Sequence, residues 1–273
     1  MSNEIARAAE IISEADSIFI TAGAGMGVDS GLPDFRGDDG FWNAYPVFKS
    51  SRQSFRDIAS ADAFFADPAG AWGFYGHRLN LYRKVIPHDG FRILKEWVNR
   101  ARGGSFVFTS NVDGQFQKAG FANSQIEECH GSIHYLQCMG GCEQVSSANG
   151  CDVVVNEQLR AARELPSCNY CGGLLRPNIL MFDDLWWNDI RHAEQREARL
   201  NWLSGDRGKL ALVECGAGCS IPTVRRTSES LLKNDKAQLI RINPNDYSVP
   251  EGAIGINMGA LDGLKAIDAL LKG

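Results

Sequence analysis

An apolar run that leads directly into a glycine-rich loop constrains the fold of this chain more than any other feature. Residues 17–21 have the length and hydrophobicity of a buried strand, and residues 21–37 contain five glycines and a proline. A glycine-rich turn between a first strand and a helix lets backbone N–H groups approach a phosphate closely. The spacing differs from the usual G-x-G-x-x-G pattern, because Val28 stands where the last glycine would be. From these residues alone, the loop is either a nucleotide-binding loop or a structural turn.

Helical and strand patterns alternate along much of the chain. Apolar residues at helical spacing mark residues 5–15 and 91–101. Short apolar runs predict further strands at residues 106–110, 209–215, 237–242 and 252–258. This alternation predicts an α/β fold with a mostly parallel, doubly wound, Rossmann-like sheet.

Two segments interrupt this alternation. Residues 41–86 are rich in aromatic residues and helical patterns, whereas residues 138–171 show little periodicity and contain five of the eight cysteines. We expect both to belong to a second, smaller lobe. The predicted division assigns residues 1–40, 104–136 and 174–273 to a large Rossmann-type domain, and the helical insertion 41–103 and the cysteine-rich module 137–173 to a small domain.

Composition and charge narrow the partners and the location. The chain has 273 residues, 44% of them apolar, and a formal charge of −5, which argues against nucleic acid as a partner. No stretch approaches the roughly 20 apolar residues that span a bilayer, so we expect no membrane association. The N-terminus lacks the pattern of a signal peptide, and we therefore expect a cytoplasmic protein whose cysteines are metal ligands or buried thiols.

Four cysteines form two close pairs along the chain. These are Cys138 with Cys142 and Cys168 with Cys171. Tetrahedral zinc favours four thiolates delivered as two pairs, because each short loop lets two sulfurs reach one ion. The two pairs are farther apart than in a usual zinc ribbon, so buried free thiols remain an alternative and Cys151 is an alternate ligand. A site of four thiolates is closed, and zinc here would be structural.

A series of motifs in fixed order resembles the sirtuins, a family of NAD-consuming protein deacylases. The motifs are GAGMGVDSGLPDFRG from Gly23, TSNVDGQFQKAG from Thr109, CHG from Cys129, the four-cysteine module, RPNILMF from Arg176, GAG from Gly216 and IN at Ile242. The resemblance implies a large Rossmann-type domain and a small zinc-bearing domain, with the active site in the cleft between them.

The resemblance also implies NAD as cofactor and assigns its contacts. The cofactor-binding residues are Gly23, Ala24, Gly25, Asp34, Phe35, Arg36, Ser110, Gly216, Ala217, Gly218 and Asn243. Asn243 resembles the contact of the family to the adenosine ribose, so we expect NAD to bind better than its 2′-phosphorylated relative, although Arg241 lies near enough in sequence to reach a phosphate. We expect Arg225 and Arg226 on an exposed helix face.

Three residues receive catalytic roles by the same resemblance. Asn111 would lie near the nicotinamide ribose, Asp113 near the nicotinamide amide, and His130 would act as general base. An imidazole with a pKa near 6.5 suits proton removal at neutral pH. The other histidines, His77, His88, His134 and His192, are expected to be structural.

The function implied by the resemblance is NAD-dependent deacylation (deacetylation) of an acyl-lysine protein or peptide. In that family nicotinamide leaves, an alkylimidate links acyl group and ribose, and water releases lysine and O-acyl-ADP-ribose. This chain departs from the family at residues 182–187, where Phe-Asp-Asp-Leu-Trp-Trp replaces Phe-Gly-Glu in the segment that pairs with the peptide as an added strand.

Two alternatives remain because of that departure. The first keeps the NAD chemistry and changes the nucleophile, which gives an ADP-ribosyltransferase or an NAD hydrolase. The second is a non-catalytic NAD or ADP-ribose sensor, and the joint presence of Asn111, Asp113 and His130 argues against it.

Overall fold

A parallel six-stranded sheet forms the larger part of the molecule. The computed structural model describes residues 2–34, 37–161 and 163–273. The strand order is β3-β2-β1-β7-β8-β9, and every paired neighbour runs parallel. The strands are β1 (Ser17–Ala22), β2 (Ser105–Thr109), β3 (Ile126–Glu128), β7 (Leu210–Cys215), β8 (Ala237–Ile242) and β9 (Ile254–Ile256). The predicted doubly wound, Rossmann-like sheet is confirmed.

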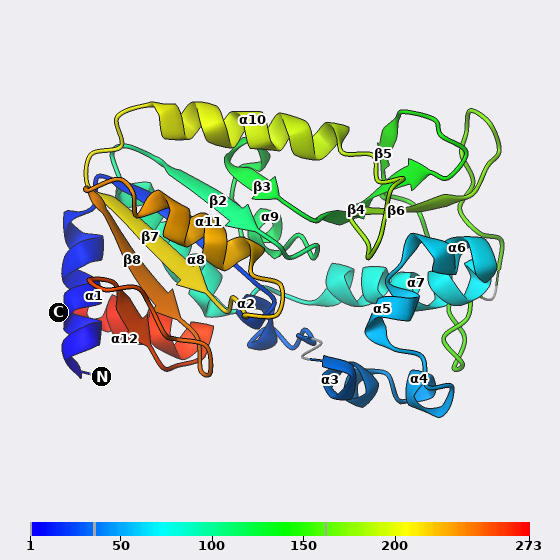
Figure 1. Ribbon diagram of the computed structural model, residues 1–273, viewed down its shortest axis with the longest axis horizontal. Helices are drawn as coiled ribbons and strands as arrows, with labels where there is room; N and C mark the ends of the chain where they lie inside the picture. The colour runs from blue at the N-terminus through cyan, green and yellow to red at the C-terminus, as the bar shows by residue number, and fades with distance from the viewer. Residues whose placement is uncertain (1, 35–36, 162) are drawn as a thin grey trace.

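Helices cover both faces of this sheet, as Figure 1 shows. Strands β1, β2 and β7 are buried along their whole length, which explains why they are continuous apolar runs rather than alternating patterns. One face packs against α1 (Ser2–Glu14), α8 (Asp89–Arg100) and α12 (Ala260–Lys272), and the other against α10 (Ile190–Ser204) and α11 (Thr223–Leu231). Short elements α2 (Gly25–Val28), α9 (Gln115–Lys118) and η1 (Asn123–Gln125) complete this part.

A second region combines five helices with a small antiparallel sheet, at the right of Figure 1. Its helices are α3 (Gly37–Ala44), α4 (Pro46–Ser50), α5 (Phe55–Ile58), α6 (Ala61–Ala66) and α7 (Pro68–Lys84). The sheet has the order β5-β4-β6, with β4 (Gly131–Cys138), β5 (Val145–Ser147) and β6 (Leu175–Ile179). Its core is strongly aromatic and includes Phe41, Trp72 and Phe74.

Helix α8 departs from the expected domain division. Phe91, Leu94 and Trp97 belong to the apolar cluster of the large sheet, and Trp97 Nε1 donates a hydrogen bond to Asp268 in α12 at 3.0 Å. These apolar residues recur at helical spacing and therefore dock as one face. We propose that the helical module ends before α8, and that β4 and β6 belong to the small domain.

Among the described residues, no helix is both long enough and apolar enough to cross a membrane.

Candidate functional site

A cavity of about 700 Å³ opens at the carboxyl edge of the parallel sheet. Its wall includes Gly23, Ala24, Gly25 and Asp34 after β1, Ser110, Asn111 and Asp113 after β2, His130 after β3, and Gly216, Ala217 and Gly218 after β7. Strand β1 lies between β2 and β7, so the chain connections beside β1 lead toward opposite edges of the sheet. This divergence leaves a crevice at the carboxyl ends of the strands. The second region closes the cavity through residues of α5, α7 and the segment after β6. The volume falls within the range of roughly 300–1,000 Å³ typical of ligand sites.

Of the predicted cofactor residues that the structure describes, Asn243 is not among those lining this wall. Phe35 and Arg36 lie outside the described residues. Asn243 is fully buried, and its Nδ2 donates to the carbonyl oxygen of Ala217 at 2.9 Å. Its Oδ1 accepts from two backbone N–H groups of the turn that follows β8. The contact of Asn243 with the adenosine ribose therefore stays a prediction. Its observed hydrogen bonds join the wall residue Ala217 to the turn after β8.

The loops after β1 and β7 touch through their backbones. A Cβ atom on Gly23 would lie 2.8 Å from Cα of Ala217, and one on Gly25 would lie 2.8 Å from Cα of Gly216. Gly216 has a φ of +63°, and its carbonyl oxygen accepts from the N–H of Gly25 at 3.0 Å. Glycine is required at this crossing because any side chain would separate the two loops.

Asn111 ties the loop after β2 to the glycine loop. Its backbone N–H donates to Oγ1 of Thr109, and its Nδ2 donates to the carbonyl oxygen of Gly23, both at 3.0 Å. Asn111 lines the cavity, where Oδ1 is an acceptor and Nδ2 keeps its second N–H.

Asp113 is a buried carboxylate on the same wall. Its side chain accepts from the N–H of Gln115 at 2.8 Å. Burial raises the pKa of Asp113 from 3.8 to about 6, and the charge of Glu128 adds to the rise while Arg78 opposes it. This carboxyl group changes its charge close to neutral pH.

Arg78 places a buried positive charge on the wall contributed by α7. Its Nε and Nη2 donate to the hydroxyl of Tyr82 at 3.0 and 2.7 Å, and its guanidinium packs on the rings of Phe74, Tyr75 and Tyr82. The sequence analysis missed this residue. The available signal was the spacing of Tyr75, Arg78 and Tyr82, which puts all three on one helix face.

His130 follows the end of β3 and is held on both sides. Its carbonyl oxygen accepts from the N–H of Leu180 at 2.9 Å, and its ring forms a hydrogen bond with the backbone of Ser110. Gly131 turns the chain with a φ of +76°, and a Cβ there would lie 2.1 Å from the carbonyl oxygen of Asn178. Burial lowers the pKa of His130, with a further contribution from His192, so the imidazole is neutral and able to accept a proton at neutral pH.

The other four histidines make contacts that fit the structural roles expected of them. Nε2 of His88 lies 2.8 Å from the carbonyl oxygen of Met26, and Nε2 of His134 lies 2.9 Å from that of Asp113. His77 bonds to the hydroxyl of Tyr45 at 3.1 Å, and His192 to the carboxylate of Glu127 at 3.1 Å.

The segment that departs from the sirtuin pattern forms an ordered turn beside the cavity. Asp184 is buried and pairs with the equally buried Arg176 at 2.7 Å, whereas Asp183 pairs with the exposed Arg56. The Trp186 side chain is 73% exposed. The cavity wall includes Leu180, Met181 and Phe182 from this segment and Gly218, Ser220 and Ile221 from the loop after β7. The segment after β6 and the loop after β7 therefore both line the cavity.

Two arginines lie differently from the sequence expectation. Arg225 is buried, not exposed, because it belongs to the inner face of α11 and donates to the carbonyl oxygens of Asp246 and Ser248 at 2.6 and 3.0 Å. Arg226 is exposed as expected. Arg241 is 1% exposed and pairs with Glu214 and Glu229, so its guanidinium is engaged within the protein.

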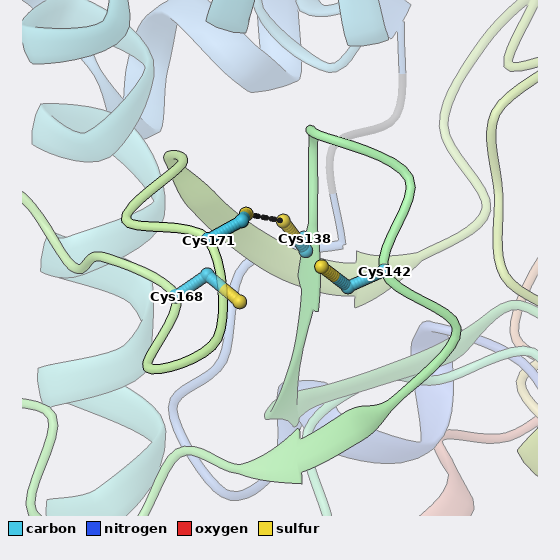
Figure 2. A group of neighbouring side chains, drawn as sticks. All are labelled: Cys138, Cys142, Cys168 and Cys171. Atoms are coloured by element: carbon cyan, nitrogen blue, oxygen red, sulfur yellow. Dashed lines mark hydrogen bonds between the residues drawn. The ribbon is translucent and has the colours of Figure 1, made fainter.

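Four cysteine sulfurs converge at the end of β4, as Figure 2 shows. The Sγ atoms of Cys138, Cys142, Cys168 and Cys171 all lie within 4.8 Å of one another, and those of Cys138 and Cys171 are 3.5 Å apart. A tetrahedral zinc–thiolate site has sulfur–sulfur edges of about 3.8 Å, given Zn–S bonds of about 2.3 Å. The N–H groups of Gly140 and Gly173 also point at two of these sulfurs. The donor set fits zinc.

Cys151 is not part of this cluster among the residues described. Its backbone carbonyl instead accepts from Nη1 of Arg83 at 2.9 Å. The alternate-ligand hypothesis for Cys151 therefore finds no support in the geometry.

A glycine-lined cavity at the carboxyl edge of a parallel sheet, together with a four-cysteine site, defines a nucleotide-binding α/β protein with a small metal-binding module. The model of the Sir2 family matches residues 23–201. The chain therefore belongs to the Sir2 family, the sirtuins.

Individual relatives and a solved structure agree with this assignment. The chain is 28% identical over 261 residues to a protein of Aquifex aeolicus (strain VF5) named NAD-dependent protein deacylase, covering 94% of this chain and 95% of that one. It is 26% identical over 251 residues to a Fusarium oxysporum f. sp. cubense protein named "Probable bifunctional ADP-ribose hydrolase/ADP-ribosyltransferase", covering 86% and 41%. A crystal structure of a Sir2 homologue–NAD complex superposes with a TM-score of 0.74 at 22% identity, covering 98% and 94%, which confirms the fold.

The cysteine cluster predicts a structural metal. Purified protein should contain about one zinc per chain, and chelation should lower its melting temperature, because metal binding contributes folding free energy. Metal analysis should find zinc lost in Cys138→Ser and retained in the control Cys151→Ser. Folded wild-type protein without zinc would contradict the site.

Buried Asp113 predicts a stability effect that depends on pH. Well below pH 3.8, the carboxyl is protonated in both the folded and the unfolded chain. Between about pH 3.8 and 6 the unfolded chain loses this proton and the folded chain keeps it, so the wild type loses stability as the pH rises. The rise of the pKa from 3.8 to about 6 corresponds to roughly 3 kcal/mol at pH 7. Asp113→Asn, which keeps the acceptor for Gln115, should therefore raise the free energy of urea unfolding at pH 7.5 and raise it less at pH 5. A variant that is less stable than wild type at pH 7.5 would contradict this reasoning.

Proposed function

We propose that this chain is an NAD-dependent protein lysine deacylase that releases nicotinamide and O-acyl-ADP-ribose. The observation that carries the proposal is the position of His130, a neutral imidazole that faces the same cavity as Asn111, Asp113 and the glycine loops. Membership of the Sir2 family supports an NAD-dependent enzyme. The nearly full-length relative from Aquifex aeolicus carries the name of this activity.

Each part of the wall has a role in this proposal. The backbone of residues 23–25 and 216–218 approaches the diphosphate closely, because these loops carry few side chains. Asn111 offers its Oδ1 to the sugar, and Asp113 accepts from the carboxamide of nicotinamide when ionised. NAD, when bound, supplies an anomeric carbon with nicotinamide as leaving group. His130 then accepts a proton from a ribose hydroxyl.

The acyl-lysine would enter through the groove between Phe182, in the segment after β6, and Gly218, in the loop after β7. Both residues line the cavity. An extended peptide can add backbone hydrogen bonds to segments on either side of such a groove. The acyl group would point inward, toward the wall that contains Arg78 and His130. We propose these substrate contacts together with the cofactor contacts named above.

A second activity is kept as an alternative because of one structural feature. The turn around Asp183 and Asp184 differs from the family pattern, follows the cavity-lining residue Phe182 and leaves Trp186 exposed. If a peptide does not dock there, another nucleophile would take the ADP-ribosyl group, which gives ADP-ribosyl transfer or NAD hydrolysis. The Fusarium oxysporum relative is named for an ADP-ribosyltransferase activity, although this chain spans only 41% of it.

Product analysis tests the proposed function. Wild-type protein should consume NAD only when an acylated lysine peptide is present, and mass spectrometry should identify O-acyl-ADP-ribose. The peptide panel should include short neutral, long neutral and carboxylate-ended acyl groups, because Arg78 places a positive charge on the wall. His130→Ala should lower kcat about 10²- to 10⁴-fold and leave NAD affinity nearly unchanged, since it removes only the base.

The control variant is His77→Ala, whose imidazole contacts Tyr45 instead of this cavity. It should retain wild-type turnover. If the peptides stay intact while NAD is consumed, the activity is ADP-ribosyl transfer or NAD hydrolysis and not deacylation. If both the peptides and NAD stay intact, the result favours the non-catalytic NAD or ADP-ribose sensor.

A further inference from the structure

Helix α10 covers the edge of the large sheet with polar side chains. Strand β3 is the last strand in the sheet order and has three residues, and α10 runs along it at the top of Figure 1. Four residues on three successive turns of α10 contact β3, and we call them the α10 clamp. They are Arg191, His192, Gln195 and Arg199.

The clamp binds Glu128 through both its backbone and its side chain. Oε1 of Gln195 accepts from the backbone N–H of Glu128 at 3.0 Å. Nη2 of Arg191 donates to the Glu128 carboxylate. The Arg191 guanidinium also lies over the ring of Tyr135, 4.1 Å from its centroid, and so links the end of β3 to β4.

Stability alone does not explain the pair of Arg191 and Glu128. Both side chains are largely buried, and within the described parts of the chain Nη1 of Arg191 and Oε1 of Glu128 are buried without a hydrogen-bond partner. Burying charges costs desolvation energy that a pair with orphaned atoms recovers incompletely, and apolar residues of similar volume are often at least as stabilising. The pair does, however, fix the position of the strand end.

That strand end determines where His130 lies. Glu128 is the last residue of β3, two residues before His130. The intervening Cys129 donates its N–H to the carbonyl oxygen of Thr109 at 2.9 Å, and His130 itself accepts from Leu180. On the open side of β3, where no strand continues the described sheet order, α10 provides the support.

We propose that Arg191 is a positioning residue for His130, acting through Glu128 at the end of β3. The inference rests on the proposed function for its kinetic consequence. Loss of the Arg191 contact lets the edge strand shift, and a shift of about 1 Å at a catalytic group can lower the rate about 100-fold.

The same helix provides a matched control. Arg199 donates to Glu127, the preceding residue of β3, and this pair is buried to a similar degree. Glu127 also contacts His192, so it keeps a partner when Arg199 is removed. Arg199→Met therefore perturbs the clamp without releasing the strand end.

Steady-state kinetics with the full chain separates positioning from folding. Arg191→Met should lower kcat about 10- to 100-fold while KM for NAD changes less than about threefold. Arg191→Lys keeps one charged donor for the hydrogen bond to Glu128 and should recover most of kcat. Arg199→Met should retain kcat within about threefold. The double variant Arg191→Met/Glu128→Leu removes both charges, so its melting temperature should exceed that of Arg191→Met while kcat stays low.

A wild-type kcat in the double variant would overturn the proposal, because the pair would then serve stability alone. Equal losses of kcat in Arg191→Met and Arg199→Met would also overturn it. A second readout does not depend on turnover. It is the NMR resonance of the His130 imidazole, measured in protein free of NAD and assigned by its loss in His130→Ala. It should shift or broaden in Arg191→Met and not in Arg199→Met, and an unchanged resonance in both would refute positioning. If wild-type protein shows no turnover, the proposed function fails, and this resonance still tests the role of Arg191.

Discussion

The close contact between two glycine loops determines the geometry of the site. The loops after β1 and β7 approach until the backbone of Gly25 bonds directly to Gly216, at a distance that excludes a Cβ atom on either residue. Parallel pairing of β1 and β7 brings both loops to the same edge of the sheet. The cavity lies beside this contact. Asn111 connects the loop after β2 to the same glycine loop, because its side chain donates to the carbonyl oxygen of Gly23. A wall made largely of backbone can approach a phosphate more closely than one made of side chains.

Several ionisable side chains are buried near these glycine loops, and burying them costs desolvation free energy. Asp113 and Arg78 line the cavity from the loop after β2 and from α7, and the buried Asp184 pairs with Arg176. Burial raises the pKa of Asp113 to about 6 and lowers the pKa of His130 from its ordinary value. Perturbed ionisable groups that converge on one cavity are typical of active sites. The free energy spent on burying Asp113 is consistent with a role in binding a substrate.

Local patterns were sufficient to predict the large sheet and the cysteine site. Strands β1, β2 and β7 are buried along their whole length, so each one leaves a mostly apolar run in the sequence. Cys138 and Cys142, like Cys168 and Cys171, lie close in sequence, and their convergence requires only that two short loops meet. The order of the motifs, rather than any single one, indicated which residues share the cavity.

Features that depend on distant partners were not predictable in this way. The burial of Arg225 and of Asn243 depends on the loop after β8, which no periodicity reveals. Arg78 lines the same cavity as the loops of the large sheet, and α8 joins that sheet through its contact with α12. Each outcome is a tertiary contact between segments that are separate in sequence, so local patterns contain little information about it.

A crystal structure of the protein with NAD and an acyl-lysine peptide tests the central claim most directly. The account predicts the diphosphate against residues 23–25 and 216–218, nicotinamide beside Asp113, and the acyl-lysine between Phe182 and Gly218 with its acyl group near His130. A dinucleotide bound away from the contact of Gly25 with Gly216, or a peptide bound outside this groove, would contradict it.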